Sequence, residues 1–316
     1  MAPTTSEPTA AVERFVAISS SFGWQDDAVL REQKHIFSAP DVILAEFRVR
    51  PSHPSWRRLN RTGDEGTLIV FPRTPVGIEQ IGRGRVVADT TRVLFYPPGQ
   101  EYRRELLSAQ GDRCSFIGIG SELFHEAVGA TPPVAAQLDP AAYLRHHTVR
   151  RRLLAGTATN ADTDEIREAL LLLVARTLTA AGANFPTASA KTDVVEETRR
   201  ILDQDLDQPL SLDDVGRAVH LSPFHLARLF RQRTGATIHA YRTSLRLRAS
   251  LERIADGQPI AHVAADLGFA SHAHLSNRFR RAFGMSPQTW RASLRSGRPV
   301  AKQQDRESLR ARAAIA

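Results

Sequence analysis

The chain repeats one pattern of residues in its last third, between positions 209 and 290. Each copy has an apolar stripe at helical spacing, a serine, a second apolar helix that carries arginine, a glycine and an aromatic–arginine pair. The first copy contains Leu212, Val215, Val219, Leu221, Ser222, Leu226, Phe230, Arg231, Gly235, Tyr241 and Arg242, and the second contains Ile260, Val263, Leu267, Phe269, Ser271, Leu275, Phe279, Arg280, Gly284, Trp290 and Arg291. The offset is 48 residues up to the turn and 49 from Ser222 and Ser271 onward. A register kept over so many positions predicts two units of one design, each a helix, a turn and a second helix.

Capping signals predict where the helices begin. Ser211 can cap the first helix, and Asp213 and Asp214 follow in its first turn, where carboxylates suit the positive end of the helix dipole. Ser222 precedes Pro223, which fits the first position of a helix because its missing N–H has no partner there in any case. Ser271 takes the corresponding place in the second unit.

The outer faces of the two capped helices carry residues that suit the major groove of DNA. The first has Phe224, Ala227, Arg228 and Arg231, and the second has His272, Ala273, Ser276, Asn277 and Arg280. Arginine can pair with a guanine edge and asparagine with an adenine edge, each through two hydrogen bonds. One basic helix face is ordinarily just solvated, but two such faces in matched register favour DNA contact.

The distribution of charge supports the same interpretation. Residues 210–295 contain 13 arginines, no lysine and five acidic residues, and therefore carry a net charge of +8. That equals the net charge of the whole chain, so the remaining residues are close to neutral. A basic module beside a neutral one is the pattern expected for contact with phosphates.

Two stretches of this region resemble the DNA-binding domain of the AraC/XylS family of bacterial transcription regulators. Residues 260–291 have its Ile-Ala start, Gly-Phe turn, spaced phenylalanines, Phe-Gly-Met-Ser-Pro segment and Trp-Arg end, and residues 221–230 have its Leu-Ser-Pro-x-x-Leu-x-Arg-x-Phe pattern. The resemblance covers about a hundred residues and implies seven helices, with a linker helix at 238–255 joining two helix-turn-helix units. It also implies that the two recognition helices enter successive major grooves of double-stranded DNA. The base-reading role then falls by position on Phe224, Ala227, Arg228, Ala273 and Asn277.

The sequence departs from the family pattern at two of these positions. His220 stands at the first turn, where the family usually has glycine, and a non-glycine residue there is expected to have positive φ. Asn277 stands where arginine is frequent, which changes the base that this position prefers.

The first half of the chain has the pattern of a β-rich domain. We expect strands at 42–49, 68–71, 76–81, 85–88, 93–96 and 115–119, separated by glycines and prolines, and such spacing favours a sandwich or barrel. With the AraC-type region behind it, the segment looks like the cupin-like sensor barrel common in that family. The stretch 93–99, Val-Leu-Phe-Tyr-Pro-Pro-Gly, resembles a cupin strand and turn.

Enzymatic chemistry is not expected in this domain. Catalytic cupins resemble one another in a His-x-His motif, whereas His35 and His53 are isolated here, so we expect no catalytic residue, no metal ion and no cofactor. Cys114 lies in an alternating apolar stretch and is expected to be buried. The residues that bind an effector are unknown from sequence; those to inspect are Trp56, Arg73, Tyr96, Tyr102 and Arg103.

Two helical stretches follow the strands. Residues 139–154 are basic, and residues 163–181 carry an apolar stripe of Ile166, Leu170, Leu173 and Val174. The stripe either packs on its own domain or forms a dimer interface, the role that the family resemblance implies. We expect a cupin-like domain at 11–135, a helical dimerisation segment at 136–182, a linker at 183–191, the DNA-binding domain at 192–296, and disordered tails at 1–10 and 297–316.

Together these patterns predict a two-domain fold, with a mostly-β cupin-like barrel and helical segment followed by an all-α domain of two helix-turn-helix units. The expected function is a cytoplasmic, sequence-specific transcription regulator of the AraC type. The resemblance implies an activator, modulated by a small-molecule effector or by dimerisation as a homodimer, that acts through contact with RNA polymerase. Two alternatives stay open, an architectural DNA binder of low specificity and a cupin-type enzyme fused to a DNA-binding module. No signal peptide and no apolar run long enough for a membrane span are found in the sequence.

Overall fold

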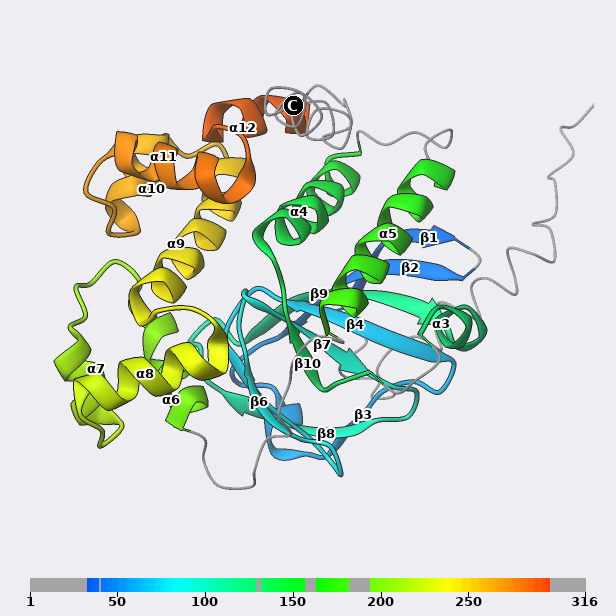
Figure 1. Ribbon diagram of the computed structural model, residues 1–316. Coiled ribbons are helices and arrows are strands. Elements are labelled where there is room, and N and C mark those ends of the chain that lie inside the picture. The colour runs from blue at the N-terminus through cyan, green and yellow to red at the C-terminus, as the bar shows by residue number, and fades with distance from the viewer. Residues whose placement is uncertain (1–32, 40, 129–131, 157–162, 182–193, 296–316) are drawn as a thin grey trace, which may run out of the picture.

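The computed structural model describes residues 33–39, 41–128, 132–156, 163–181 and 194–295. A β-rich region occupies one side of the molecule and a helical region the other (Figure 1). This order, strands first and the helix-turn-helix region last, confirms the coarse expectation from sequence. The proposed tails at 1–10 and 297–316 and the linker at 183–191 lie outside the described residues.

Ten strands of the described chain form two antiparallel sheets. The six-stranded sheet has the order β1 (Gln33–Ala39), β2 (Val42–Val49), β9 (Asp112–Gly120), β4 (Gly66–Pro72), β7 (Arg92–Tyr96) and β10 (Ala135–Gln137). The four-stranded sheet has the order β3 (Asn60–Arg61), β8 (Glu101–Leu106), β5 (Val76–Gln80) and β6 (Gly84–Ala88). Strand pairing among the described residues joins each sheet separately, so the single closed barrel expected from sequence is replaced by two sheets with their own edges.

The large sheet is buried on both faces, which explains why its central strands are almost continuously apolar. In β2, Ile43, Ala45 and Phe47 belong to the core shared with the small sheet. Val42 and Leu44, on the opposite face, belong to a core shared with the helices.

The space between the two sheets is filled by side chains. Only about 10 Å³ of free space remains among the residues there, which include Tyr96, Tyr102 and Cys114. Arg104 lies in the same interior, with its Nε atom 3.5 Å from an Asp112 carboxylate oxygen and its guanidinium 4.8 Å from the centre of the Phe47 ring. Cys114 is buried, as predicted.

A short 3-10 helix (Pro54–Arg57) and three helices complete this region: α3 (Ser121–Val128), α4 (Pro140–Leu154) and α5 (Thr163–Ala181). The basic stretch in α4 is not a surface feature, because His146, His147 and Arg150 are buried. His146 stacks on Phe71 with ring centroids 3.9 Å apart, and its Nε2 atom lies 3.1 Å from the Ser115 hydroxyl. These residues therefore pack and hydrogen-bond within the fold instead of facing solvent.

The apolar stripe of α5 packs on its own region. Leu170, Leu173 and Val174 are buried, and α5 contacts α4, β2 and β10. Leu172, on the outer side of the helix, is 50% exposed. Of the two alternatives left open by the sequence, packing within the chain therefore accounts for the stripe itself.

Between residues 194 and 295, the described part of the helical region contains seven helices, as the family resemblance implies: α6 (Val194–Asp203), α7 (Leu212–Ala218), α8 (Pro223–Thr234), α9 (Ile238–Ala255), α10 (Ile260–Asp266), α11 (His272–Phe283) and α12 (Pro287–Arg295). The long helix α9 lies between the α7–α8 pair and the α10–α11 pair (Figure 1). It has the same bounds as the linker helix predicted from sequence.

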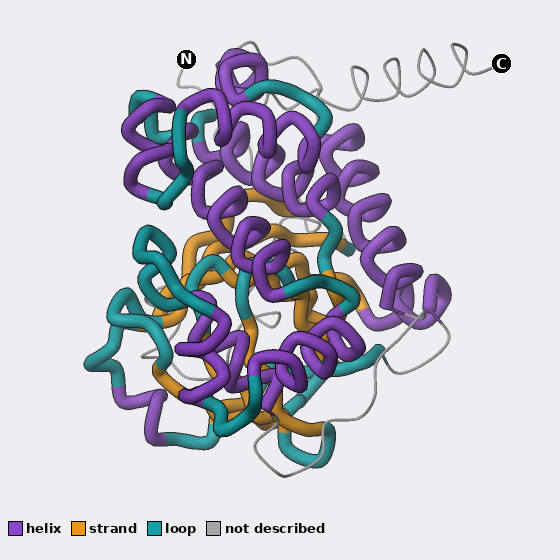
Figure 2. The backbone as a smooth tube through the Cα atoms, turned by 60° about the vertical axis from the view of Figure 1, so that its left-hand side comes forward, coloured by secondary structure: helices purple, strands orange, loops and turns teal. Residues whose placement is uncertain are grey.

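The helical region packs directly on the β-rich region. Helix α4 contacts α9, α11 and α12, and α6 contacts β6. In Figure 2 the helices cover one side of the sheets. Both helix-turn-helix units are therefore attached to the first region, each through different elements.

Candidate nucleic-acid interface

The first helix-turn-helix unit consists of α7, a short turn and α8. Ser211 and Asp214 form a reciprocal capping box at the start of α7, and Ser222 caps α8 by accepting the His225 N–H at 3.3 Å. In the turn, the Leu221 N–H donates to the Gly216 carbonyl at 2.9 Å. His220 has a φ of 57°, which is the positive value expected from its place in the turn.

The second unit, α10 and α11, is built in the same way. Ser271 caps α11 by accepting the His274 N–H at 3.1 Å, and the Phe269 N–H donates to the Ala264 carbonyl at 2.9 Å. Gly268 takes the place of His220, with a φ of 66°. A Cβ atom on Gly268 would lie 2.7 Å from the Asp207 carbonyl oxygen, so this turn tolerates only glycine, whereas the first turn accommodates a side chain.

Each recognition helix is held by an aromatic residue on its inner face. Phe230 of α8 is fully buried and meets the Tyr241 ring edge to face, with centroids 5.3 Å apart. Phe279 of α11 is also fully buried and lies beside Phe283 and Trp290. The inward face of each helix is thereby fixed, and so is the direction in which its outer face points.

The outer faces are largely exposed, as their sequence pattern predicted. Seven of the eight residues proposed for DNA contact are exposed, namely Phe224, Arg228, Arg231, His272, Ala273, Asn277 and Arg280, whereas Ala227 is only partly exposed. Phe224 is the most exposed of the large hydrophobic residues found among the described positions, at 80%. The structure therefore presents each proposed set on one accessible helix face.

The structure adds exposed residues that the sequence analysis did not select. His225 lies on the open side of α8, and His274 and Arg281 lie on that of α11. On α12, the Gln288 side chain lies 3.3 Å from His272, which brings the start of α12 beside the start of α11. Helical spacing could have found His274 and Arg281, because they lie three residues before and four residues after Asn277. Nothing in the sequence indicates that Gln288 is close to α11.

Part of the positive charge of this region serves the fold. Arg242 donates to the carbonyls of Asp205 and Gln208, at 2.9 and 2.7 Å. Arg246 donates to the Leu206 carbonyl at 2.6 Å and to the Gly268 carbonyl at 2.9 Å. Because these carbonyls lie before the first unit and in the turn of the second, α9 ties the two units together. The net charge of +8 therefore overstates the positive charge that can contact DNA. The exposed arginines of α8 and α11 are a better measure of that charge.

The described residues show neither a metal site nor a membrane-spanning helix. No group of three or more histidine, cysteine, aspartate or glutamate side chains is arranged to hold a metal ion in that part of the chain. No helix in the described ranges is both long enough and apolar enough to cross a membrane.

Comparison with known proteins identifies the helical region. Residues 215–293 match a family model described as a helix-turn-helix domain. The regulatory protein SoxS of Escherichia coli K12 is 33% identical over 102 residues, which cover 32% of this chain and 95% of that protein. Among solved structures, a transcriptional regulator of Chromobacterium violaceum with an AraC-type DNA-binding domain is 28% identical and covers 33% of this chain and 93% of its own, with a TM-score of 0.31. ToxT from Vibrio cholerae O395 is 11% identical and covers 84% of this chain and 99% of its own, with a TM-score of 0.35.

Proposed function

This chain belongs to the AraC family of DNA-binding transcription regulators, which are not enzymes, and from that premise we propose that it reads a specific DNA sequence with α8 and α11. The two helices enter successive major grooves of double-stranded DNA. The observation that carries this proposal is the pair of matched frames, with the same caps, the same turn hydrogen bond and a buried phenylalanine, each presenting an exposed polar face.

The proposed contacts follow from the chemistry of each exposed side chain. Arg228, Arg231 and Arg280 donate to phosphates or guanine edges, and Asn277 pairs with an adenine edge. Phe224 supplies apolar contact to a thymine methyl group or a sugar. His272, Ala273 and Ala227 line the same faces, where their small or polar side chains let the helices approach the bases.

The first test is a gel-shift titration at physiological salt with the DNA upstream of the protein's own gene and with random DNA of equal length. Strong preference for the upstream DNA is the expected result. Equal and steeply salt-dependent binding to both, at this and other candidate promoters, would instead identify an architectural binder, since phosphate contacts alone give that dependence.

A single variant tests base reading by the first unit. Arg228→Ala is expected to weaken specific binding by about 1–3 kcal/mol, the range for a lost bidentate base contact, with a smaller loss on random DNA. Arg233→Ala is the matched control, because it removes an exposed arginine from the same helix about 140° away from Arg228 around the axis. Equal losses on specific and random DNA for Arg228→Ala would assign it to phosphate contact only.

We propose that the β-rich region is a metal-free, cupin-like sensor, with domain limits at 11–135, 136–182 and 192–296. The sensor responds to a small-molecule effector, and the regulator acts in the cytoplasm as an activator that contacts RNA polymerase. A transcription assay with purified polymerase tests activation. Reduced transcription in that assay would instead identify a repressor. Leu172, on the outer side of α5, is an exposed apolar residue suited to the proposed homodimer interface, and sedimentation of the Leu172→Glu variant tests it.

A further inference from the structure

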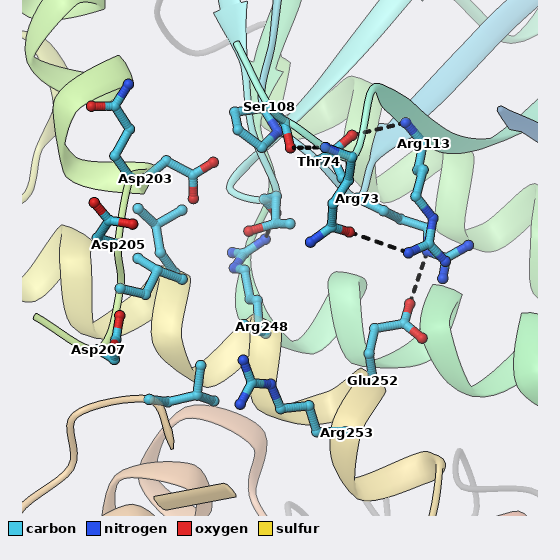
Figure 3. Close-up of a pocket in the computed structure, with 18 of the residues that line it drawn as sticks. Arg73, Thr74, Ser108, Arg113, Asp203, Asp205, Asp207, Arg248, Glu252 and Arg253 are labelled. Carbon is cyan, nitrogen blue, oxygen red and sulfur yellow. Dashed lines mark hydrogen bonds and ion pairs between the residues drawn. The ribbon is translucent and has the colours of Figure 1, made fainter. Parts of the chain in front are cut away.

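A cavity of about 670 Å³ lies between the β-rich region and the helical region. Its size is within the usual range of small-molecule sites, roughly 300–1,000 Å³. One wall is formed by the loop after α6 with α9, and the other by the β4–β5 and β8–β9 turns. Figure 3 shows Asp203, Asp205 and Asp207 on one side, Arg73, Thr74 and Arg113 on the other, and Arg248 between them.

Another candidate place for a ligand, the space between the two sheets, is closed. Tyr96, Tyr102 and the Arg104–Asp112 ion pair occupy that interior, and only about 10 Å³ is free. A small molecule could enter there only if these buried side chains moved out together. The cavity between the regions is open without any such movement.

Most charged groups around the cavity already have partners. Arg73 donates to Glu46 and Glu252 at 2.9 Å each, and Arg253 lies 3.1 Å from Asp266. Arg248 donates to the carbonyls of Thr90 and Leu138. Because these charged groups are already paired, they are not the expected contacts for a ligand.

Asp203 differs, because its half-buried carboxyl group has no hydrogen-bond or ion-pair partner among the described residues. Among the described residues no hydrogen bond or ion pair reaches its carboxylate, although the side chain is largely shielded from solvent and directed into the cavity (Figure 3). Burial, together with the charge of nearby Asp89, raises the pKa of Asp203 to about 8. A cation placed beside this group would stabilise its ionised carboxylate form.

Arg113, on the facing wall of the cavity, is a cation without an ion-pair partner among the described residues. Its guanidinium reaches the side chain of Gln110 at 3.4 Å, and no ion pair to it is present in the described part of the chain. Burial and the neighbouring charge of Arg73 lower the pKa of Arg113. An anion beside Arg113 would balance it, just as a cation would balance Asp203.

We propose that this cavity binds a zwitterionic small molecule, with an ammonium or guanidinium group at Asp203 and a carboxylate at Arg113. Arg113 comes from β9 and Asp203 from the end of α6, so one ligand bridges the sensor region and the DNA-binding region. A ligand that binds only where both walls are in place stabilises that arrangement by its binding free energy. The effector proposed above thereby gains a chemical class, and only this regulatory consequence rests on the proposed function.

The test is calorimetric titration of the full chain, without DNA, using ω-amino acids as probes. The probes are 4-aminobutanoate, 6-aminohexanoate and 8-aminooctanoate, compared with hexylamine and hexanoate, which each lack one of the two charges. We expect at least one zwitterion to bind about tenfold or more tightly than both single-charge compounds, since each removes one charge-assisted contact. Absence of binding by all three zwitterions, or equal binding by hexylamine or hexanoate, overturns the proposal.

Variants locate the binding within the cavity. Asp203→Asn is expected to remove the preference for the zwitterion over hexanoate, and Arg113→Gln its preference over hexylamine. Asp213→Asn and Arg57→Gln are matched controls, because each removes an exposed charge of the same kind outside the cavity, and both are expected to leave affinity unchanged. Equal loss in the controls places the effect outside the cavity and overturns the assignment. Since no DNA is present, a failure here is separate from a failure of DNA recognition.

Discussion

The two helix-turn-helix units have the same frame, but their contacts with the β-rich region differ. The second unit shares one continuous apolar core with that region, in which Phe279, Phe283 and Trp290 lie in the same cluster as Tyr143 of α4. The first unit has a core of its own around Leu226 and Phe230. Its link to the sheets is a network of buried polar groups.

That network centres on Tyr241 of α9. The Tyr241 hydroxyl donates to Asp89 and accepts from Thr91 at 3.0 Å and from Arg199 at 2.5 Å. Beside it, Arg92 donates twice to Glu196 of α6, at 2.6 and 2.7 Å. Although burial opposes it, the charge of Arg92 holds the pKa of Glu196 below its usual value.

The difference between the two attachments matters for regulation. Apolar burial is non-directional and depends little on charge, whereas a buried polar network is costly once one partner is lost. We therefore expect a local change of charge or geometry to loosen the first unit more than the second. The cavity beside Asp203 is lined by residues of both regions, including Tyr143 of the apolar core.

The largest expected effect comes from breaking the apolar attachment. Trp290→Ala is expected to lower the free energy of unfolding by about 3–5 kcal/mol, because a fully buried indole is lost together with its hydrogen bond to Thr148 at 3.0 Å. Urea denaturation measures it. Phe224→Ala is the control, since it truncates an aromatic side chain that is 80% exposed and should leave stability nearly unchanged. Equal losses in the two variants would contradict the continuous core.

A smaller and more local effect is expected from the polar attachment. Tyr241→Phe removes only the hydroxyl, leaves Asp89 and Arg199 short of a partner, and is expected to cost about 1–3 kcal/mol. Hydrogen exchange should rise in α6–α8 and stay unchanged in α10–α12. Tyr143→Phe is the matched control, because no hydrogen bond of its hydroxyl is found in the described structure. Faster exchange in both units alike would show that the two attachments are not independent.

The two turns should respond in opposite directions. Gly268→Ala is expected to destabilise the chain by about 1–3 kcal/mol, because φ is positive and a Cβ atom would collide with the Asp207 carbonyl. His220→Gly should be neutral or stabilising by up to about 1 kcal/mol, since it relieves a positive φ on a non-glycine residue. Thermal unfolding of both variants checks this, and equal destabilisation would mean that the turns share one constraint.

The last effect depends on pH and concerns Asp203. Its pKa of about 8 in the folded chain lies above the ordinary value of about 3.9, so the folded state holds a proton that the unfolded state has released. Stability should therefore fall as pH rises from about 4 to 8. Asp203→Asn lacks this titration, and its melting temperature relative to the wild type should be higher at pH 8.5 than at pH 4.5. The same difference at both pH values would refute the raised pKa.

The sequence alone determined the local features of this protein. The bounds of α5, α9 and β2 agree with those predicted, and Ser211, Ser222 and Ser271 cap the helices that they were expected to cap. Capping, helical spacing and apolar runs act between residues close in sequence, so they are readable without the fold. The exposed faces of α8 and α11 follow from the same periodicity.

Only the tertiary structure decided how those elements are used. Strand β8 was not predicted because its inward residues are Tyr102 and Arg104, which look like surface residues until Asp112 and the second sheet enclose them. Likewise, Arg150 looked like part of a basic surface, but the fold pairs it with Glu46 and Glu252. The cavity between Asp203 and Arg113 also arises only when the two regions pack. In each case the deciding interaction joins residues far apart in sequence, and no local pattern records the charge or the surface that a residue will meet.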